Sequence, residues 1–237
     1  MDRLKLQSAT LLLLCIAAPN VFASGLFRTP YLGIEVIQTN QNYPNNYGNP
    51  VYKKNPQDYA IYGGFKFSRY FGIEAAYEFQ PKLDKTTTIT AGQSVPGGPI
   101  LTGGAFDSVH SSIKGEHPYV GLFAELDAKN KGWFCCFKWQ ALVGASFSHF
   151  KATTQVTAVN GVPQNLPTVT YSKSKVVPMA LIGVTGFFTS HVGLRLFVDY
   201  HNFNQFTIPG SLAPFTTKIK DTWGVGLGLT YGFCKLV

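Results

Sequence analysis

Residues 222–233 carry the clearest hydrophobic pattern in the chain, a strict period of two. One face is large and apolar and runs from Trp223 to Phe233, while the other face consists of four glycines and Thr230. A period of two is typical of a β-strand, and a glycine face suits a crowded interior. Aromatic residues near both ends of the apolar face favour a transmembrane β-barrel, since about 9–11 tilted residues cross a bilayer. A strand of a soluble barrel or sandwich shows the same alternation.

The alternation recurs along the chain and predicts eight strands. The expected strands span, in order, 27–39, 58–67, 72–79, 113–127, 133–153, 171–188, 192–206 and 222–233, with 86–90 as an extension of the third. Long polar stretches near 40–56, 81–111, 154–170 and 207–215 alternate with short connections at 68–70, 128–132 and 189–191. Long extracellular loops, short periplasmic turns and an even strand number are the pattern of outer-membrane barrels. The sequence therefore predicts an all-β fold, an eight-stranded antiparallel transmembrane β-barrel.

The phase of the strands predicts which side chains face lipid and which face the lumen. The expected outward aromatic girdle consists of Tyr59, Phe65, Phe67, Tyr77, Phe79, Trp139, Phe147, Tyr200, Trp223, Tyr231 and Phe233. The expected lumen charges are Glu35, Glu74, Glu78, Glu125, Asp199, Lys66, Lys138 and Arg195. The interior of an eight-stranded barrel is only wide enough for its own side chains. We therefore expect these charges to pair across the lumen and to close it.

The start of the chain has the pattern of a secretory signal. Arg3 and Lys5 precede a short apolar run at 11–18, and small or apolar residues follow up to Ala23. The run is too short for a transmembrane helix, so we expect cleavage after Ala23 and a barrel domain over 24–237. The mean hydropathy of +0.05 fits a chain without a second long apolar run.

Three segments carry a family resemblance. Phe67–Tyr77 resembles the second strand, turn and third strand of OmpA-like transmembrane domains, and Leu194–Tyr200 and Gly226–Phe233 are similar to that family's last two strands. The resemblance implies an outer-membrane barrel with an internal network of ion pairs. The chain departs from the pattern after Phe233, where Cys234-Lys-Leu-Val237 follows the aromatic. We expect the barrel domain alone, without a peptidoglycan-binding domain.

Basic residues gather in the expected loops and rims. They are Lys53, Lys54, Lys82, Lys85, Lys151, Lys173, Lys175, Lys218 and Lys220. The formal net charge is +8, which suits contact with the phosphates of lipopolysaccharide and other outer-membrane lipids. Adhesion to acidic host surface or matrix components is the second interpretation. Export excludes nucleic acid as a partner, and we expect a monomer.

Three cysteines follow the expected cleavage site: Cys135, Cys136 and Cys234. Cys136 and Cys234 lie at periplasmic strand ends, but their strands are three steps apart, or roughly 14 Å. A disulfide needs Cα atoms within about 7 Å, so only a tail that folds back would join them. The spacing of Cys and His residues matches no zinc motif, and we expect no metal site and no cofactor.

Lipid A deacylases are small outer-membrane barrels with a late His-x-Ser-Asn arrangement. The nearest match is His201-Asn-Phe-Asn204, with Phe203 at the place of the nucleophile, and His110-Ser-Ser112 lacks the following Asn. His149 follows Ser148, but neighbouring residues of a strand point to opposite faces. These patterns favour a non-enzymatic envelope protein that acts in integrity, adhesion or immune evasion through its loops. A small pore is the alternative, and a lipid-modifying enzyme is the third hypothesis.

Overall fold

The computed structural model describes residues 29–41, 55–90, 106–128, 136–159, 161–163, 167–204, 206–209 and 216–233. The wall strands are β1 (Thr29–Asn40), β2 (Gln57–Lys66), β3 (Phe71–Thr90), β4 (Phe106–Glu116), β5 (Tyr119–Ala128), β6 (Cys136–Val159), β8 (Val169–Phe187), β9 (Val192–His201) and β12 (Thr222–Gly232). The short strands are β7 (Val162–Pro163), β10 (Phe206–Pro209) and β11 (Thr216–Ile219). No helix within these ranges is long and apolar enough to cross a membrane.

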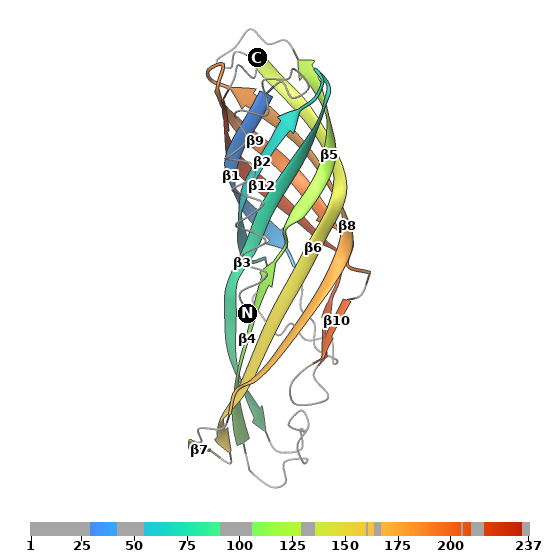
Figure 1. The fold of residues 1–237 in the computed structure, drawn as a ribbon. Coiled ribbons are helices and arrows are strands. Elements are labelled where there is room, and N and C mark those ends of the chain that lie inside the picture. The colour runs from blue at the N-terminus through green and yellow to red at the C-terminus, as the bar shows by residue number, and fades with distance from the viewer. Residues whose placement is uncertain are drawn as a thin grey trace.

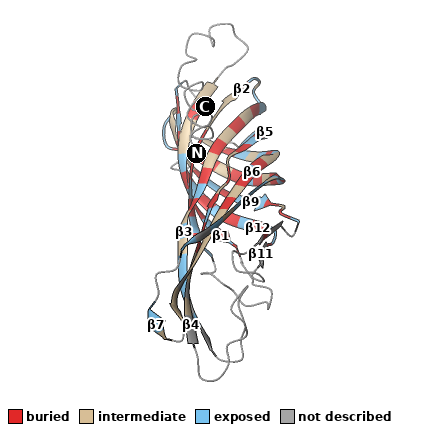
Figure 2. Ribbon diagram, turned by 60° about the horizontal axis from the view of Figure 1, so that its bottom comes forward, coloured by how far each residue is buried: buried red, intermediate tan, exposed pale blue. Residues whose placement is uncertain are grey.

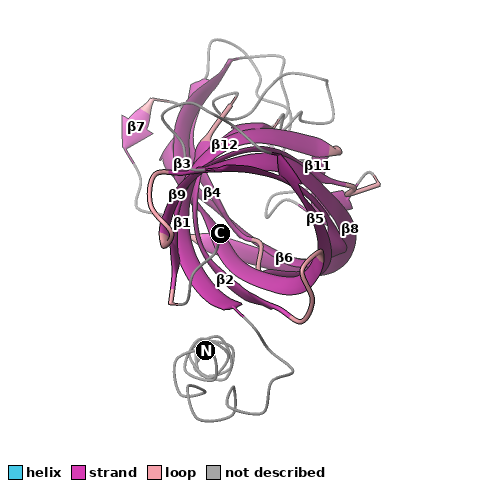
Figure 3. Cartoon of the chain, turned by 90° about the horizontal axis from the view of Figure 1, so that it is seen from above, coloured by secondary structure: helices cyan, strands magenta, loops and turns pink. Residues whose placement is uncertain are grey.

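The wall closes on itself (Figure 3). Every pairing is antiparallel, and β1 pairs with both β2 and β12, so the first and last wall strands join. β4 and β5 both pair with β3 on one side and β6 on the other, so they are two halves of one strand. The described wall therefore has eight strands, and the predicted eight-stranded antiparallel barrel is confirmed.

His117 and Pro118 interrupt the strand that the sequence predicted as continuous over 113–127. Pro118 has no N–H to donate to a ladder. The backbone compensates locally, because the His117 N–H donates to the Glu78 carbonyl at 2.8 Å and the Phe147 N–H donates to the Pro118 carbonyl at 2.7 Å. The wall stays closed across the break, and the His117 side chain is buried in the barrel.

Burial alternates along the wall with the expected period (Figure 2). In β12, every residue from Thr222 to Gly232 alternates between buried and exposed, with the glycine face inside. Aliphatic residues such as Leu126, Val143 and Ile182 are about two-thirds exposed on the outer face. Such a continuous apolar exterior needs an apolar solvent, which the hydrocarbon of a bilayer provides.

Four strands extend well past the others at one end (Figure 1). β3, β4, β6 and β8 run on beyond the level where β1, β2, β9 and β12 end, and β7 lies near their far tips. The sequence predicted loops in parts of this region, and that prediction is wrong for 81–85, 106–111, 154–159 and 169–170, whereas the predicted strand extension at 86–90 is confirmed. These residues pair along their length, as in Thr86 with His110 and Thr154 with Val169.

Further strand limits also differ from the expected ones. β9 ends at His201 rather than at 206, and the predicted loop at 207–215 contains strand residues, since β10 pairs with β11 from Phe206–Ile219 to Pro209–Thr216. The predicted signal segment at 1–23, the centre of the first loop at 42–54, and residues Cys135 and Cys234 lie outside the described residues. Cys136 is half-buried against the inner apolar cluster.

Candidate functional site

The lumen holds the strongest concentration of polar chemistry in the described barrel. The layers are counted from the end with the short connections, which is the top of Figure 1. The first of them, called the lower layer, contains an ion pair between Lys66 on β2 and Glu125 on β5. Lys138 on β6 lies 4.0 Å from Glu125 Oε1 and 3.6 Å from Asp127 Oδ1. The strand phase turns all three long side chains into the lumen, where they are buried.

Arg195 on β9 organises the middle layer and is 1% exposed. Its Nη1 donates to Glu35 Oε1 at 2.9 Å and to Glu74 Oε1 at 3.1 Å. The hydroxyls of Tyr31 and Tyr119 donate to the same Glu74 carboxylate at 2.7 and 2.9 Å. Donors from three other strands thus converge on the Glu74 carboxylate of β3, and a buried charge with this many donors is well compensated.

Aromatic rings pack around this ion pair. The Arg195 guanidinium carbon lies 4.9 Å from the centre of the Tyr62 ring and 5.3 Å from the centre of the Phe197 ring. The Tyr62 hydroxyl in turn hydrogen-bonds Thr230 on β12. The cross-section at this level is therefore occupied by side chains.

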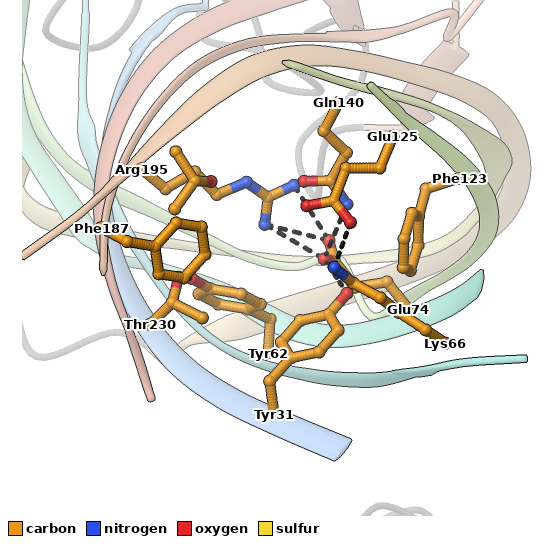
Figure 4. A pocket seen from close by; sticks show the side chains of 11 residues that line it. Tyr31, Tyr62, Lys66, Glu74, Phe123, Glu125, Gln140, Phe187, Arg195 and Thr230 are labelled. Atoms are coloured by element: carbon orange, nitrogen blue, oxygen red, sulfur yellow. Dashed lines mark hydrogen bonds and ion pairs between the residues drawn. The ribbon is translucent and has the colours of Figure 1, made fainter. Parts of the chain in front are cut away.

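A small cavity separates the lower and middle layers (Figure 4). Its volume is about 30 Å³, and Lys66, Glu74, Glu125 and Arg195 are among the side chains that line it. This space holds about one water molecule.

The upper layer gathers acidic groups and a histidine. Asp58, Glu78, Asp199 and His201 are all at least nine-tenths buried here. The His201 Nε2 lies 3.7 Å from Glu78 Oε2 and 3.6 Å from Asp199 Oδ2. Asp58 accepts a hydrogen bond from the Thr39 hydroxyl. A set of one imidazole nitrogen and two carboxylate oxygens is chemically able to hold a divalent metal.

An apolar cap covers the upper layer. It consists of Ile113, Phe150, Val177, Phe203, Ile208 and Ile219. Phe203 stacks on His201 with ring centres 6.2 Å apart, and Phe150 lies 4.8 Å from the ring centre of His117. The hairpin of β10 and β11 contributes Ile208 and Ile219, which are almost fully buried. The cap therefore combines residues of the β10–β11 hairpin with buried side chains of β4, β6 and β8.

All eight lumen charges named from the sequence lie buried inside the barrel. The structure joins Arg195 to Glu35 and Glu74, and joins Lys66 and Lys138 to Glu125. It places Glu78 and Asp199 in a separate cluster with His201. Asp58 and His117 are further buried lumen groups that were not predicted from the sequence, although the outward phase of Tyr59 implies that Asp58 faces inward.

The outward aromatic residues named from the sequence lie on the outer face. Nine of them are exposed, and Phe65 and Tyr77 are half-buried. Tyr59 stacks on Phe79 across β2 and β3, with ring centres 5.6 Å apart, and Trp223 faces Tyr200 across β12 and β9. Aromatic belts of this kind sit at the edges of the hydrocarbon layer.

The histidine and serine patterns considered from the sequence do not assemble a deacylase site in the described residues. His201 is enclosed with Glu78 and Asp199, beneath the cap. His110 Nδ1 contacts the Thr86 hydroxyl at 3.2 Å, and His149 Nδ1 contacts the Ser174 hydroxyl at 2.7 Å on the outer face. Ser148 points into the barrel, away from His149.

On the extended part of β3, past its last pairing with β2, Asp84 forms a small surface cluster with Lys82 and His110. Lys82 Nζ lies 2.9 Å from Asp84 Oδ1, and His110 Nε2 lies 3.3 Å from the same oxygen. The hydrogen bond from Lys82, together with the neighbouring His110, holds the pKa of Asp84 below its usual range.

The closed antiparallel wall, the filled lumen and the exposed apolar belt define a transmembrane β-barrel of the outer-membrane type. Three solved structures are similar to it. The attachment invasion locus protein Ail of Yersinia pestis, in complex with the heparin analogue sucrose octasulfate, has 14% identity and a TM-score of 0.43 over 86% of this chain and 98% of that one. Neisserial surface protein A has 11% identity and a TM-score of 0.45 over 89% and 98%. The outer membrane protein OprG of Pseudomonas aeruginosa has 10% identity and a TM-score of 0.47 over 88% and 97%. The sequence matches no protein-family model and no curated protein.

Proposed function

We propose that this protein is a non-enzymatic, monomeric barrel of the bacterial outer membrane that presents a binding surface outside the cell and contributes to envelope integrity. One observation carries the proposal. Buried side chains occupy the lumen from the Lys66 layer to the Phe203 cap, while β3, β4, β6 and β8 continue beyond the ends of β1, β2, β9 and β12. A barrel built for transport needs an open path, whereas a barrel built for contact needs surface.

The outer face of the extended strands suits anionic partners. Lys82 and Lys114 are exposed on this face, and Lys151 lies beside Lys114 in the register of β4 and β6. Hydroxyl groups of Ser172 and Ser174 follow on β8. Ammonium groups with neighbouring hydroxyls bind phosphate and sulfate by charge-assisted hydrogen bonds. Lipopolysaccharide phosphates and acidic surface components of a host are the partners of this chemistry.

Binding of cells to dextran sulfate tests the surface, with neutral dextran as the reference probe. Cells that carry the protein should bind the sulfated polymer more strongly than cells without it, and added salt should weaken the binding. The combined variant Lys82→Ser, Lys114→Ser, Lys151→Ser should lose this difference, while Lys→Arg at the same three positions should retain it. Equal binding by the serine variant would contradict the proposed surface.

Planar-bilayer recording of the purified protein tests the filled lumen. We expect no stable open state in the unmodified barrel. A large and persistent conductance would favour the alternative function, a small pore.

The relationship to OmpA-like domains, predicted from Phe67–Tyr77 and the last two strands, stays a prediction.

A further inference from the structure

The upper lumen layer differs from the layers below it in how its charges are compensated. Glu125 has Lys66 and Lys138, and the Glu35 and Glu74 carboxylates have Arg195. Among the described residues, the ion pairs of Glu78 and Asp199 are with His201 alone.

These contacts are too long to serve as hydrogen bonds. Both ring nitrogens of His201 lack a hydrogen-bond partner, although the residue is 5% exposed. Glu78 Oε2 and Asp58 Oδ1 also lack one, at 3% and 1% exposure. Buried polar atoms without partners are costly, and a group of them around one point indicates a bound species that satisfies them together.

We propose that the layer of Glu78, Asp199 and His201 binds a divalent transition-metal cation of the zinc class. The three donor atoms lie within 4.8 Å of one another, and His201 Nε2 is 3.7 and 3.6 Å from the two carboxylate oxygens. Zinc bonds of about 2.0–2.2 Å place tetrahedral donors about 3.3–3.6 Å apart. Small side-chain adjustments therefore bring all three atoms to bonding distance.

The surroundings of this layer favour a cation and exclude competing water. Asp58 interacts electrostatically with both Asp199 and His201, so a third carboxylate adds to the negative field. Phe203 stacks on His201 from the side of the cap, and His117 lies 6.2 Å from the His201 ring centre. The site extends the proposed function, because a metal that links β3 to β9 would rigidify the mouth from which the extended strands project.

The site is enclosed, so the metal must be supplied while the barrel folds. The full-length mature protein would be refolded in detergent with Zn²⁺ or with a chelator, desalted, and analysed for bound metal and for its unfolding temperature. We expect about one zinc per barrel and a higher unfolding temperature in the zinc-refolded sample. Refolding with Co²⁺ should give the visible absorption of a tetrahedral site with nitrogen and oxygen donors.

Variants separate this layer from the surface. His201→Gln and Asp199→Asn keep the size of the side chains and should lose the metal, the Co²⁺ spectrum and the temperature shift. His110→Gln, at the exposed cluster with Asp84, is the matched control and should retain all three. Native gel migration shows whether each variant folds.

Absence of bound zinc in the folded unmodified protein would overturn the proposal, as would zinc that persists in folded His201→Gln. A doubly protonated His201 ring seen by NMR without bound metal would show that the imidazolium compensates the charges of Glu78 and Asp199, and would also overturn the proposal. Loss of the site leaves the polyanion binding of the three surface lysines untouched, so the two proposals fail separately.

Discussion

Arg195 on β9 donates to Glu35 on β1 at 2.9 Å, although 160 positions separate the two residues in the chain. The strand between them is β12, and Gly228 is the register partner of both Glu35 and Arg195. A methyl group at Gly228 would come within 2.7 Å of Glu35 Cγ. The bare inner face of β12 is therefore what allows two long charged side chains to meet across it.

Loss of Arg195 should destabilise the barrel strongly. Arg195→Ala leaves Glu35 and Glu74 buried without their cation, and breaking a buried ion pair in this way costs about 3–5 kcal/mol. Denaturant unfolding of the refolded protein in detergent measures the change in the free energy of unfolding. Arg69→Ala removes an exposed arginine paired with Asp127 and is the matched control, for which we expect little change. Equal stability of the two variants would show that Arg195 belongs to no essential network.

The extended strands should be reachable from outside intact cells. In a background in which serine replaces the cysteines, Thr88→Cys places a thiol on the exposed face of β3, in the part that extends past β2. A membrane-impermeant maleimide should label it on whole cells. Arg69→Cys, in the tight connection between β2 and β3, should react only after the outer membrane is opened. The reverse labelling pattern would invert the orientation of the barrel.

The wall of the barrel was readable from the sequence where one face is apolar. Apolar residues from Trp223 to Phe233 alternate with glycine and Thr230, and the same alternation in the first and seventh predicted strands places Glu35 and Arg195 on the inner face, where they are buried. The extended parts of β3, β4, β6 and β8 were readable only in part. Residues 86–90 and 151–153 were predicted as strand, but 154–159 was predicted as loop, because polar stretches such as Thr153-Thr-Gln155 lack an apolar face against lipid. This part of β6 is a strand because its backbone pairs with β4 on one side and with β8 on the other.

The grouping of the lumen charges was not readable for a different reason. Which acid meets which base depends on the register between strands far apart in the chain. Glu78 and His201 come from β3 and β9, and nothing in their local sequence specifies their approach to 3.7 Å. The apolar cap could not be predicted for the same reason. Ile208 lies beside Pro209 in a stretch with the composition of a loop, and only the pairing of β10 with β11 brings it into one cluster with Ile219.

The Asp84 cluster should have only a weak, acid-sensitive effect. The pKa of Asp84 is lowered in the folded protein, first by the hydrogen bond from Lys82. The carboxylate therefore contributes stability above its unfolded pKa of about 3.9, and loses it as the pH falls through the lower folded value. The Asp84 side chain is 43% exposed. Solvent screening therefore keeps its contribution to the free energy of unfolding below about 1 kcal/mol. Asp84→Asn should thus be slightly less stable than the unmodified protein at pH 7, and the difference should vanish well below pH 4. A difference that grows on acidification would give the pKa shift the wrong sign.

The glycine face of β12 should tolerate no side chain where a rigid ring fills the space. Gly226 is the register partner of Phe197, and a methyl group there would overlap the Phe197 ring. Phe197 is 2% exposed and packs against the Arg195 guanidinium, so the ring has no room to move away. Gly226→Ala should therefore cost about 1–3 kcal/mol, the usual range for overpacking.

A second substitution distinguishes this clash from a loss of backbone freedom. Phe197→Leu alone removes ring volume and should destabilise the barrel, but in combination with Gly226→Ala it makes room for the added methyl group. The double variant should be more stable than the sum of the two single changes predicts, as residues in direct contact do in a double-mutant cycle. Denaturant unfolding of the four proteins measures this coupling. Additive effects would mean that Gly226 is needed for the conformation of the backbone. They would contradict the explanation that glycine is needed at this position to make room for the Phe197 ring.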